Sequence, residues 1–191
     1  DSMEYKMLEV GNIPLFRINT ANGLEVLVKD ESQNPFGTFK DRKSRDVAEH
    51  AKAAGIDYVM AITSGNYGFS LSNFLSDLGI NTILFVPYGI DRRVLELLEQ
   101  KATVIPVDLE EQELTTEKLE AIAGRTLNLA GSKVINATTF YDDAYLDIFR
   151  EIKGELDKRG KEPDYVVLPC GSGELFAAAL RYYHLSDTKI I

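Results

Sequence analysis

Short runs of apolar residues alternate along this chain with longer segments of helical periodicity. The runs cover residues 58–62, 82–86, 103–107, 134–136, 165–169 and 188–191, and Gly, Pro or Asn bounds them. Such runs are typical of strands buried on both faces of a parallel sheet. The pattern predicts right-handed βαβ units and an α/β fold with open, mostly parallel sheets and helices on both faces.

The intervening segments place apolar side chains at helical spacing. One helix is predicted from Tyr67, Leu71, Phe74, Leu75 and Leu78, with Gly79 suited to end it. Other predicted helices are lined by Val47, Ala48, Ala51 and Ala54, by Val94, Leu95 and Leu98, by Leu119, Ile122 and Ala123 after an N-cap at Thr115 or Thr116, and by Tyr145, Ile148, Phe149, Ile152 and Leu156. Residues 24–29 predict a further strand after a turn at Asn22-Gly23.

Composition narrows the classes of function. The 191 residues include 30 acidic and 21 basic ones, a formal charge of 21 − 30 = −9, which argues against a nucleic-acid or anionic-membrane partner. The hydrophobic fraction of 45% suits a globular protein, and one cysteine excludes an internal disulfide framework. No stretch of apolar residues approaches the length of a membrane span. We therefore expect a cytoplasmic protein that acts on a small molecule and binds no metal.

The loop at residues 34–42, Asn-Pro-Phe-Gly-Thr-Phe-Lys-Asp-Arg, places Lys40 at the start of a predicted helix. The positive end of the helix dipole makes an amine there easier to deprotonate, which suits a nucleophile that forms a Schiff base. The alternative is a solvated lysine in a basic first turn, because Arg42, Lys43 and Arg45 follow.

Two further loops join a predicted strand to a predicted helix, where open α/β sheets bind ligands. Residues 63–68, Thr-Ser-Gly-Asn-Tyr-Gly, combine hydroxyls, a glycine and helix N-terminal N–H groups, which makes either an anion site or an ordinary N-cap. Residues 170–175, Cys-Gly-Ser-Gly-Glu-Leu, let backbone N–H groups approach a phosphate. This second loop lacks the dinucleotide and P-loop signatures, and Glu174 argues against a triphosphate. Cys170 is expected to be a small core residue at a strand end, or else a nucleophile.

Taken together, the three loops resemble those of the fold-type II pyridoxal-phosphate (PLP) enzymes, the group of threonine synthase, cysteine synthase, threonine dehydratase and the tryptophan synthase β chain. A weaker match is the segment 11–17, Gly-Asn-Ile-Pro-Leu-Phe-Arg, near the start. The order and spacing of the motifs extend the resemblance over nearly the whole chain.

The resemblance implies the roles of individual residues. Lys40 would form the Schiff base with PLP and then act as general base on the α-proton. Asn66 would lie beside the phenolic oxygen of the cofactor. The phosphate would be held by Gly171, Ser172, Gly173, Glu174 and Leu175, and the substrate carboxylate by Thr63, Ser64, Gly65, Asn66 and Tyr67.

The resemblance also implies an activity: β/γ-elimination or replacement on an activated serine or homoserine derivative. Residues 37–42 are closest to threonine synthases and dehydratases, whereas residues 63–68 with Asn136 and residues 140–143 favour cysteine synthases. The leading prediction is a threonine-synthase-like lyase or synthase of amino-acid biosynthesis. Arg92 and Arg93 would recognise a phosphorylated substrate or form a solvated face.

The family pattern predicts three parts: residues 1–40 open the large domain with the lysine segment, residues 41–143 form the small α/β domain, and residues 144–191 resume the large domain with the phosphate loop. Family members run past this length and place the partner of the pyridine nitrogen near their C-terminus. We therefore expect a fragment, a site completed by a second chain, or a non-catalytic phosphate-binding or regulatory module. When complete, the protein is expected to be a homodimer or larger homo-oligomer with an amino-acid substrate.

Overall fold

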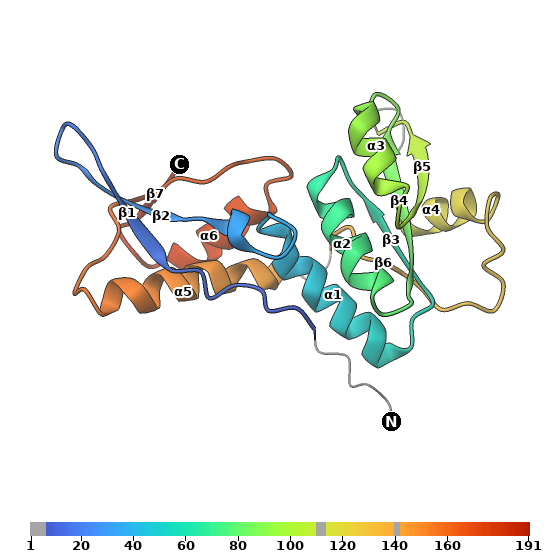
Figure 1. Cartoon of the computed structure of the whole chain (residues 1–191), viewed down its shortest axis with the longest axis horizontal. Coiled ribbons are helices and arrows are strands. Elements are labelled where there is room, and N and C mark those ends of the chain that lie inside the picture. The colour runs from blue at the N-terminus through green and yellow to red at the C-terminus, as the bar shows by residue number, and fades with distance from the viewer. Residues whose placement is uncertain (1–6, 110–113, 140–141) are drawn as a thin grey trace. The chain divides into compact units, whose positions relative to one another are not determined.

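The computed structural model describes residues 7–109, 114–139 and 142–191, and it divides into two compact units (Figure 1). We call the described residues of Ser44–Tyr141, with Met7, the sheet unit, and Leu8–Lys43 with Asp142–Ile191 the lysine unit. Helix α1 (Lys40–Ala54) begins in the lysine unit and continues in the sheet unit. The domain boundaries predicted from the sequence stay a prediction.

The sheet unit is built on four parallel strands in the order β5-β4-β3-β6 (Figure 1). Their bounds are Tyr58–Ile62 for β3, Asn81–Pro87 for β4, Thr103–Val107 for β5 and Val134–Asn136 for β6. The prediction of burial on both faces is right for β3 and β4, which lie in the middle. It is wrong for β5 and β6, whose residues are mostly half-buried because each pairs with one neighbour in this sheet.

Helices cover both faces of this sheet, which confirms the predicted fold class. Helix α4 (Thr116–Ala123), capped by Thr115, packs on the face that carries Met60, Ile83 and Phe85. Helix α2 (Asn66–Ser76) covers the other face, where an added Cβ at Gly68 would lie 3.0 Å from Leu84. Helix α3 (Arg92–Leu98) completes the unit. None of the helices formed by described residues is long and apolar enough to cross a membrane.

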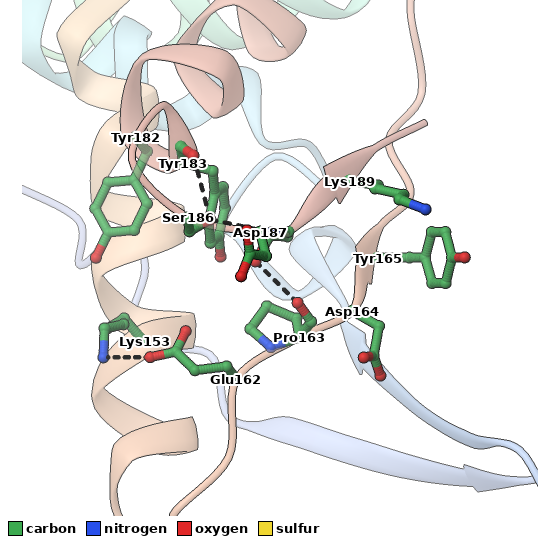
Figure 2. A pocket seen from close by; sticks show the side chains of 11 residues that line it. Lys153, Glu162, Pro163, Asp164, Tyr165, Tyr182, Tyr183, Ser186, Asp187 and Lys189 are labelled. Carbon is green, nitrogen blue, oxygen red and sulfur yellow. Dashed lines mark hydrogen bonds and ion pairs between the residues drawn. The ribbon is translucent and has the colours of Figure 1, made fainter.

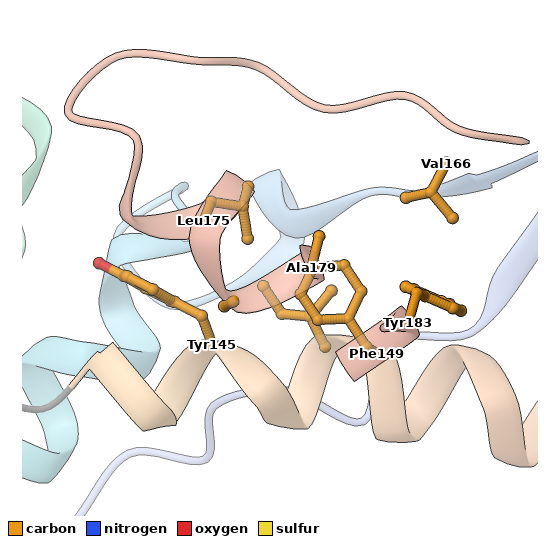
Figure 3. Packing of buried hydrophobic residues seen from close by; sticks show 8 residues of the cluster. Tyr145, Phe149, Val166, Leu175, Ala179 and Tyr183 are labelled. Carbon is orange, nitrogen blue, oxygen red and sulfur yellow. The ribbon is translucent and has the colours of Figure 1, made fainter. Parts of the chain in front are cut away.

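The lysine unit combines two short two-stranded sheets with two helices. Strands β1 (Leu15–Asn19) and β2 (Glu25–Lys29) are antiparallel, and β7 (Tyr165–Val166) pairs in parallel with β8 (Lys189–Ile190). Helices α5 (Leu146–Asp157) and α6 (Glu174–Tyr183) and the 3-10 turns η1 (Glu31–Gln33) and η2 (Asp142–Tyr145) complete the unit. Figure 3 shows the core between α5 and α6, formed by Tyr145, Ile148, Phe149, Val166, Leu175, Ala178, Ala179 and Tyr183.

Several sequence expectations about single residues are wrong. Cys170 is exposed rather than buried at a strand end, because β7 stops at Val166 and the chain then runs on irregularly, with Val167 73% exposed. Ala54 is exposed at the last residue of α1, and Leu78 lies beyond the end of α2. Gly79 does adopt the left-handed conformation, with φ of +70°, that ends the preceding helix.

A buried guanidinium joins three segments of the lysine unit. Arg42, only 2% exposed, bonds both carboxylate oxygens of Glu31 in η1 at 2.7 and 2.8 Å. It also bonds both oxygens of Glu151 in α5 at 2.7 and 3.0 Å, and Lys29 at the end of β2 reaches Glu151 at 2.5 Å. We call these four residues, Lys29, Glu31, Arg42 and Glu151, the arginine cluster. Arg42 lies two residues after Lys40, so the cluster fixes the first turn of α1.

Replacing Arg42 should destabilise the protein strongly. Arg42→Met leaves Glu31 and Glu151 without their main counter-charge, and breaking a buried pair in this way costs about 3–5 kcal/mol. The measurement is urea unfolding followed by circular dichroism. Arg92→Met is the matched control, because its side chain is 89% exposed and its ion pair with Glu96 is worth at most about 1 kcal/mol. Equal effects of the two substitutions would contradict the structural role of the cluster.

The cluster should also make stability depend on acid pH. Burial alone would raise the pKa of Glu151. The hydrogen bonds from Arg42, Lys29 and the Asn12 backbone outweigh burial and lower the pKa from the ordinary 4.5 to about 2. The pKa of Glu151 is therefore lower in the folded state than in the unfolded state. Its contribution to stability is complete above about pH 4.5 and is lost as the pH falls towards 2. We expect the unfolding free energy to drop across this window. In Glu151→Gln the unfolding free energy should drop less, because about one proton fewer is taken up on unfolding in this window. The measurement is a series of urea titrations at several pH values.

Candidate functional site

A turn with defined hydrogen bonds sets the start of α1 at Lys40. Gly37 adopts φ of +75°, and its N–H donates to the Asn34 carbonyl at 2.9 Å. The Thr38 hydroxyl accepts from the Lys40 N–H at 3.2 Å, and the Asp41 carboxylate accepts from the Phe36 N–H at 2.7 Å. These contacts place Lys40 as the first helical residue, as the sequence predicts.

The Lys40 amine lies in a partly buried, aromatic environment. Its side chain is 16% exposed, and Nζ lies 5.0 Å from the ring centroid of Phe39 and 5.2 Å from that of Tyr145. Nζ also donates to Glu174 Oε2 at 2.8 Å. The sequence indicated the helix N-terminus at Lys40 but not the contact with Glu174.

Glu174 belongs to the glycine turn, residues 170–175, that precedes α6. Gly173 has φ of +81°, a conformation that requires glycine, and no atom comes within 4 Å of where a Cβ would stand at Gly171 or Gly173. The N–H groups of the first turn of α6 have no acceptors within the helix, and they lie at its positive end. The structure thus brings together, within one unit, the predicted lysine and the predicted phosphate loop.

A second lysine reaches the same carboxylate. Lys43 Nζ lies 2.6 Å from Glu174 Oε1, and the Lys43 side chain is fully buried. Burial raises the pKa of Glu174, but the hydrogen bonds from Lys40 and Lys43 outweigh it and lower the pKa to about 2. Glu174 is therefore ionised at neutral pH. We call Lys40, Lys43 and Glu174 the lysine cluster.

Arg42 and Lys43, which follow Lys40 in this basic first turn, are not solvated. Both are buried, and each is paired with glutamates from distant segments. The sequence did hold one signal: Lys43 precedes Val47 by four residues and Ala51 by eight, so it falls on the apolar face of α1. Its carboxylate partner, 131 residues away, had no such signal.

The loop predicted to bind the substrate carboxylate lies in the sheet unit, between β3 and α2. Its turn is closed by the Thr63 hydroxyl, which accepts from the N–H groups of Gly65 at 3.1 Å and Gly68 at 2.9 Å. An added Cβ at Gly68 would lie 2.5 Å from the Thr63 Cγ2, so glycine is required there. Thr63 is buried, so this residue acts on the shape of the turn.

The other residues of this loop divide by exposure. Tyr67 is buried, and its hydroxyl donates to the Ala137 carbonyl at 2.7 Å. Ser64 and Asn66 are exposed, and Gly65 is half-buried with φ of +150°. Asn66 begins α2, so its side chain and that of Ser64 stand at the positive end of this helix. Phe140 and Tyr141, which favoured cysteine synthases, lie outside the described residues.

The residues of the lysine unit fit a phosphorylated aldehyde such as PLP. A primary amine with limited exposure can react with the aldehyde, and the open glycine turn at the N-terminus of α6 suits a phosphate dianion. The amines of Lys40 and Lys43 contact the two oxygens of Glu174 beside this turn.

The described residues include other polar features. A cavity of about 470 Å³ opens beside β7 and β8, where Figure 2 shows Lys189 next to Tyr165. Burial raises the pKa of Tyr183, which lines the cavity, to about 12. Arg92 and Arg93 are exposed. Within the described ranges, no three His, Cys, Asp or Glu residues are placed to hold a metal.

Comparison with known proteins identifies the family. The model of the family described as pyridoxal-phosphate dependent enzyme matches residues 6–191. The 2-amino-4-ketopentanoate thiolase beta subunit of Acetoanaerobium sticklandii is 27% identical over 91% of this chain and 39% of its own length. A cysteine synthase of Dictyostelium discoideum is 32% identical over 51% of this chain and 29% of its own length, and a threonine synthase of a Bacillus species matches a shorter stretch. The chain thus spans well under half of these relatives.

Solved structures show the same fold. An O-ureido-L-serine synthase superposes with a TM-score of 0.72 at 22% identity, covering 95% of this chain and 60% of that one. The family resemblance of the three loops, including the fold type and the cofactor of the family, is therefore confirmed. This chain belongs to the family of pyridoxal-phosphate dependent enzymes.

Proposed function

We propose that this chain carries the lysine and the phosphate turn of an enzyme that eliminates or replaces a β or γ substituent of an activated serine or homoserine derivative, as threonine synthases do. One observation carries the proposal: the Lys40 amine lies 2.8 Å from a carboxylate of the glycine turn, although 134 residues separate them. The proposal keeps the predictions of a cytoplasmic homo-oligomer and an amino-acid substrate.

The residues of the lysine unit have separate tasks in this proposal. Lys40 would hold the cofactor at its aldehyde carbon through Nζ, and would move the proton at the substrate Cα. The turn from Gly171 to Leu175 holds the phosphate with its N–H groups. When bound, PLP supplies an electron sink for the negative charge that develops at Cα. The rings of Phe39 and Tyr145 limit the access of water to the Lys40 amine.

The residues of the sheet unit orient the substrate in this proposal. The segment from Thr63 to Tyr67 binds the α-carboxylate, with the exposed Ser64 and Asn66 as contacting side chains. Asn66 would also contact the phenolic oxygen of the cofactor. Thr63 and Tyr67 keep the turn in shape through their bonds to Gly65, Gly68 and Ala137.

A second candidate substrate comes from the relative aligned over 91% of this chain, whose name specifies 2-amino-4-ketopentanoate. Cysteine synthase activity and the dehydration of threonine or serine are further candidate reactions. Adding phosphohomoserine, O-phosphoserine, O-acetylserine, threonine or 2-amino-4-ketopentanoate to the cofactor-loaded protein distinguishes them, because the cofactor absorbance changes only with a compound that reacts.

Borohydride should trap the cofactor on Lys40. The purified protein incubated with PLP should absorb near the visible range, and reduction of the C=N bond should add the cofactor mass to the peptide that contains Lys40. Lys40→Ala should abolish this adduct, whereas Lys52→Ala, an exposed lysine of the same helix, should leave it unchanged. Phosphate binding that survives Lys40→Ala without any adduct in the unsubstituted protein would instead support a non-catalytic phosphate-binding module.

Ser64→Ala should weaken substrate binding and leave cofactor loading unchanged. The substitution removes one exposed hydroxyl from the carboxylate loop, and the loss of a hydrogen bond to a charged group is worth about 1.5–3 kcal/mol. The measurement is the substrate concentration that gives the half-maximal change in cofactor absorbance, which should rise roughly tenfold or more. Ser76→Ala, at the exposed end of α2, is the control. An unchanged midpoint in Ser64→Ala would remove the loop from the substrate site.

A further inference from the structure

The glycine turn contains a feature that opposes its proposed use. Glu174 follows Gly173 directly and begins α6, so an ionised carboxylate stands in the turn to which the proposed function assigns a phosphate dianion. Two negative groups a few ångströms apart repel each other strongly in a partly buried site. The turn can hold the phosphate only if another group neutralises the carboxylate.

Lys40 cannot serve lastingly as that group. Its amine would condense with the aldehyde carbon with loss of water, so its ion pair with Glu174 at 2.8 Å would change in the loaded protein. Its partial exposure suits this reactive role. The neutralising charge must come from a group that does not react.

Lys43 meets this requirement. It lies one helical turn after Lys40 on α1, its side chain is fully buried, and its Nζ lies 2.6 Å from Glu174 Oε1. The two lysines bind different oxygens of the carboxylate, since Lys40 contacts Oε2. The Ser172 hydroxyl donates to Oε2 at 3.1 Å, which further fixes the carboxylate. Lys43 can therefore stay paired with Glu174 while Lys40 reacts.

We propose that Lys43 is a positioning residue of the cofactor site: its ammonium neutralises and holds Glu174, and the glycine turn can then accept the phosphate dianion of the cofactor. This inference rests on the proposed function. Lys43 acts on the phosphate through Glu174 and makes no contact with the phosphate itself. The effect of Lys43 on phosphate binding must therefore depend on the presence of the Glu174 carboxylate.

A double-mutant cycle tests this dependence. The dissociation constants of PLP and of pyridoxal, which lacks the phosphate, are measured by absorbance titration for the unsubstituted protein, Lys43→Met, Glu174→Gln and the double variant. Lys43→Met should weaken PLP binding about tenfold or more, because the carboxylate then faces the phosphate with one counter-charge fewer. It should weaken pyridoxal binding far less. Glu174→Gln and the double variant should bind PLP equally well, and at least as well as the unsubstituted protein.

Each contrary outcome is decisive. A double variant that binds PLP more weakly than Glu174→Gln would show that Lys43 contacts the phosphate directly. Equal losses of PLP and pyridoxal binding in Lys43→Met would show a merely structural role of Lys43. Either result overturns the inference. The comparison of the double variant with Glu174→Gln holds even if Lys43→Met alone fails to fold. Lys52→Met is the matched control on the same helix.

The proposed function is read out separately in the same experiment. Borohydride trapping of PLP on Lys40 in the unsubstituted protein supports the proposed function, whatever the cycle shows. An adduct on Lys40 with no coupling between Lys43 and Glu174 would overturn only the inference about Lys43. No adduct on Lys40 would overturn the proposed function.

Discussion

The place of the Lys40 amine depends on the buried guanidinium of Arg42, two residues further along α1. Arg42 bonds glutamates from η1 and α5, segments that lie 11 and 109 residues from it in sequence. A planar guanidinium can satisfy two carboxylates at once, which a lysine ammonium cannot do in the same geometry. The first turn of α1 is thus fixed in the lysine unit by directional bonds as well as by apolar packing.

The two ionic clusters of the lysine unit differ in their place relative to the glycine turn. The arginine cluster balances two cations, Lys29 and Arg42, against Glu31 and Glu151, so 2 − 2 = 0. The lysine cluster pairs Lys40 and Lys43 with the two oxygens of Glu174, a residue of the glycine turn. The arginine cluster therefore suits a fixed scaffold, whereas the lysine cluster lies in the turn to which the proposed function assigns the phosphate.

The sequence predicted those parts of the fold whose signal is local. Residues 58–62, 103–107 and 134–136 form strands with the predicted bounds, because a short apolar run between turn residues is itself a strand signal, even where the strand is only half-buried. Strand β1 was not predicted, because it has no continuous apolar run; its residues from Phe16 to Asn19 alternate apolar and polar side chains and are all exposed. The three loops were recognised by composition, but their roles stay predictions.

The partners of charged residues could not be predicted at all. Nothing in the sequence near Lys43 indicates that a glutamate 131 residues later is its partner. Only the three-dimensional packing of α1 against the start of α6 reveals that ion pair. The same limit applies to Glu151 on α5. Its sequence neighbours do not indicate that it pairs with Arg42 and Lys29.

Cys170 has a practical consequence. It is the sole cysteine of the sequence, it is exposed, and it directly precedes Gly171. A maleimide dye would therefore attach at one position only, at the edge of the glycine turn, without any engineered thiol. Its emission would sense the arrival of a negatively charged ligand in the turn, which gives a fluorescence readout of occupancy that is independent of the cofactor's own colour.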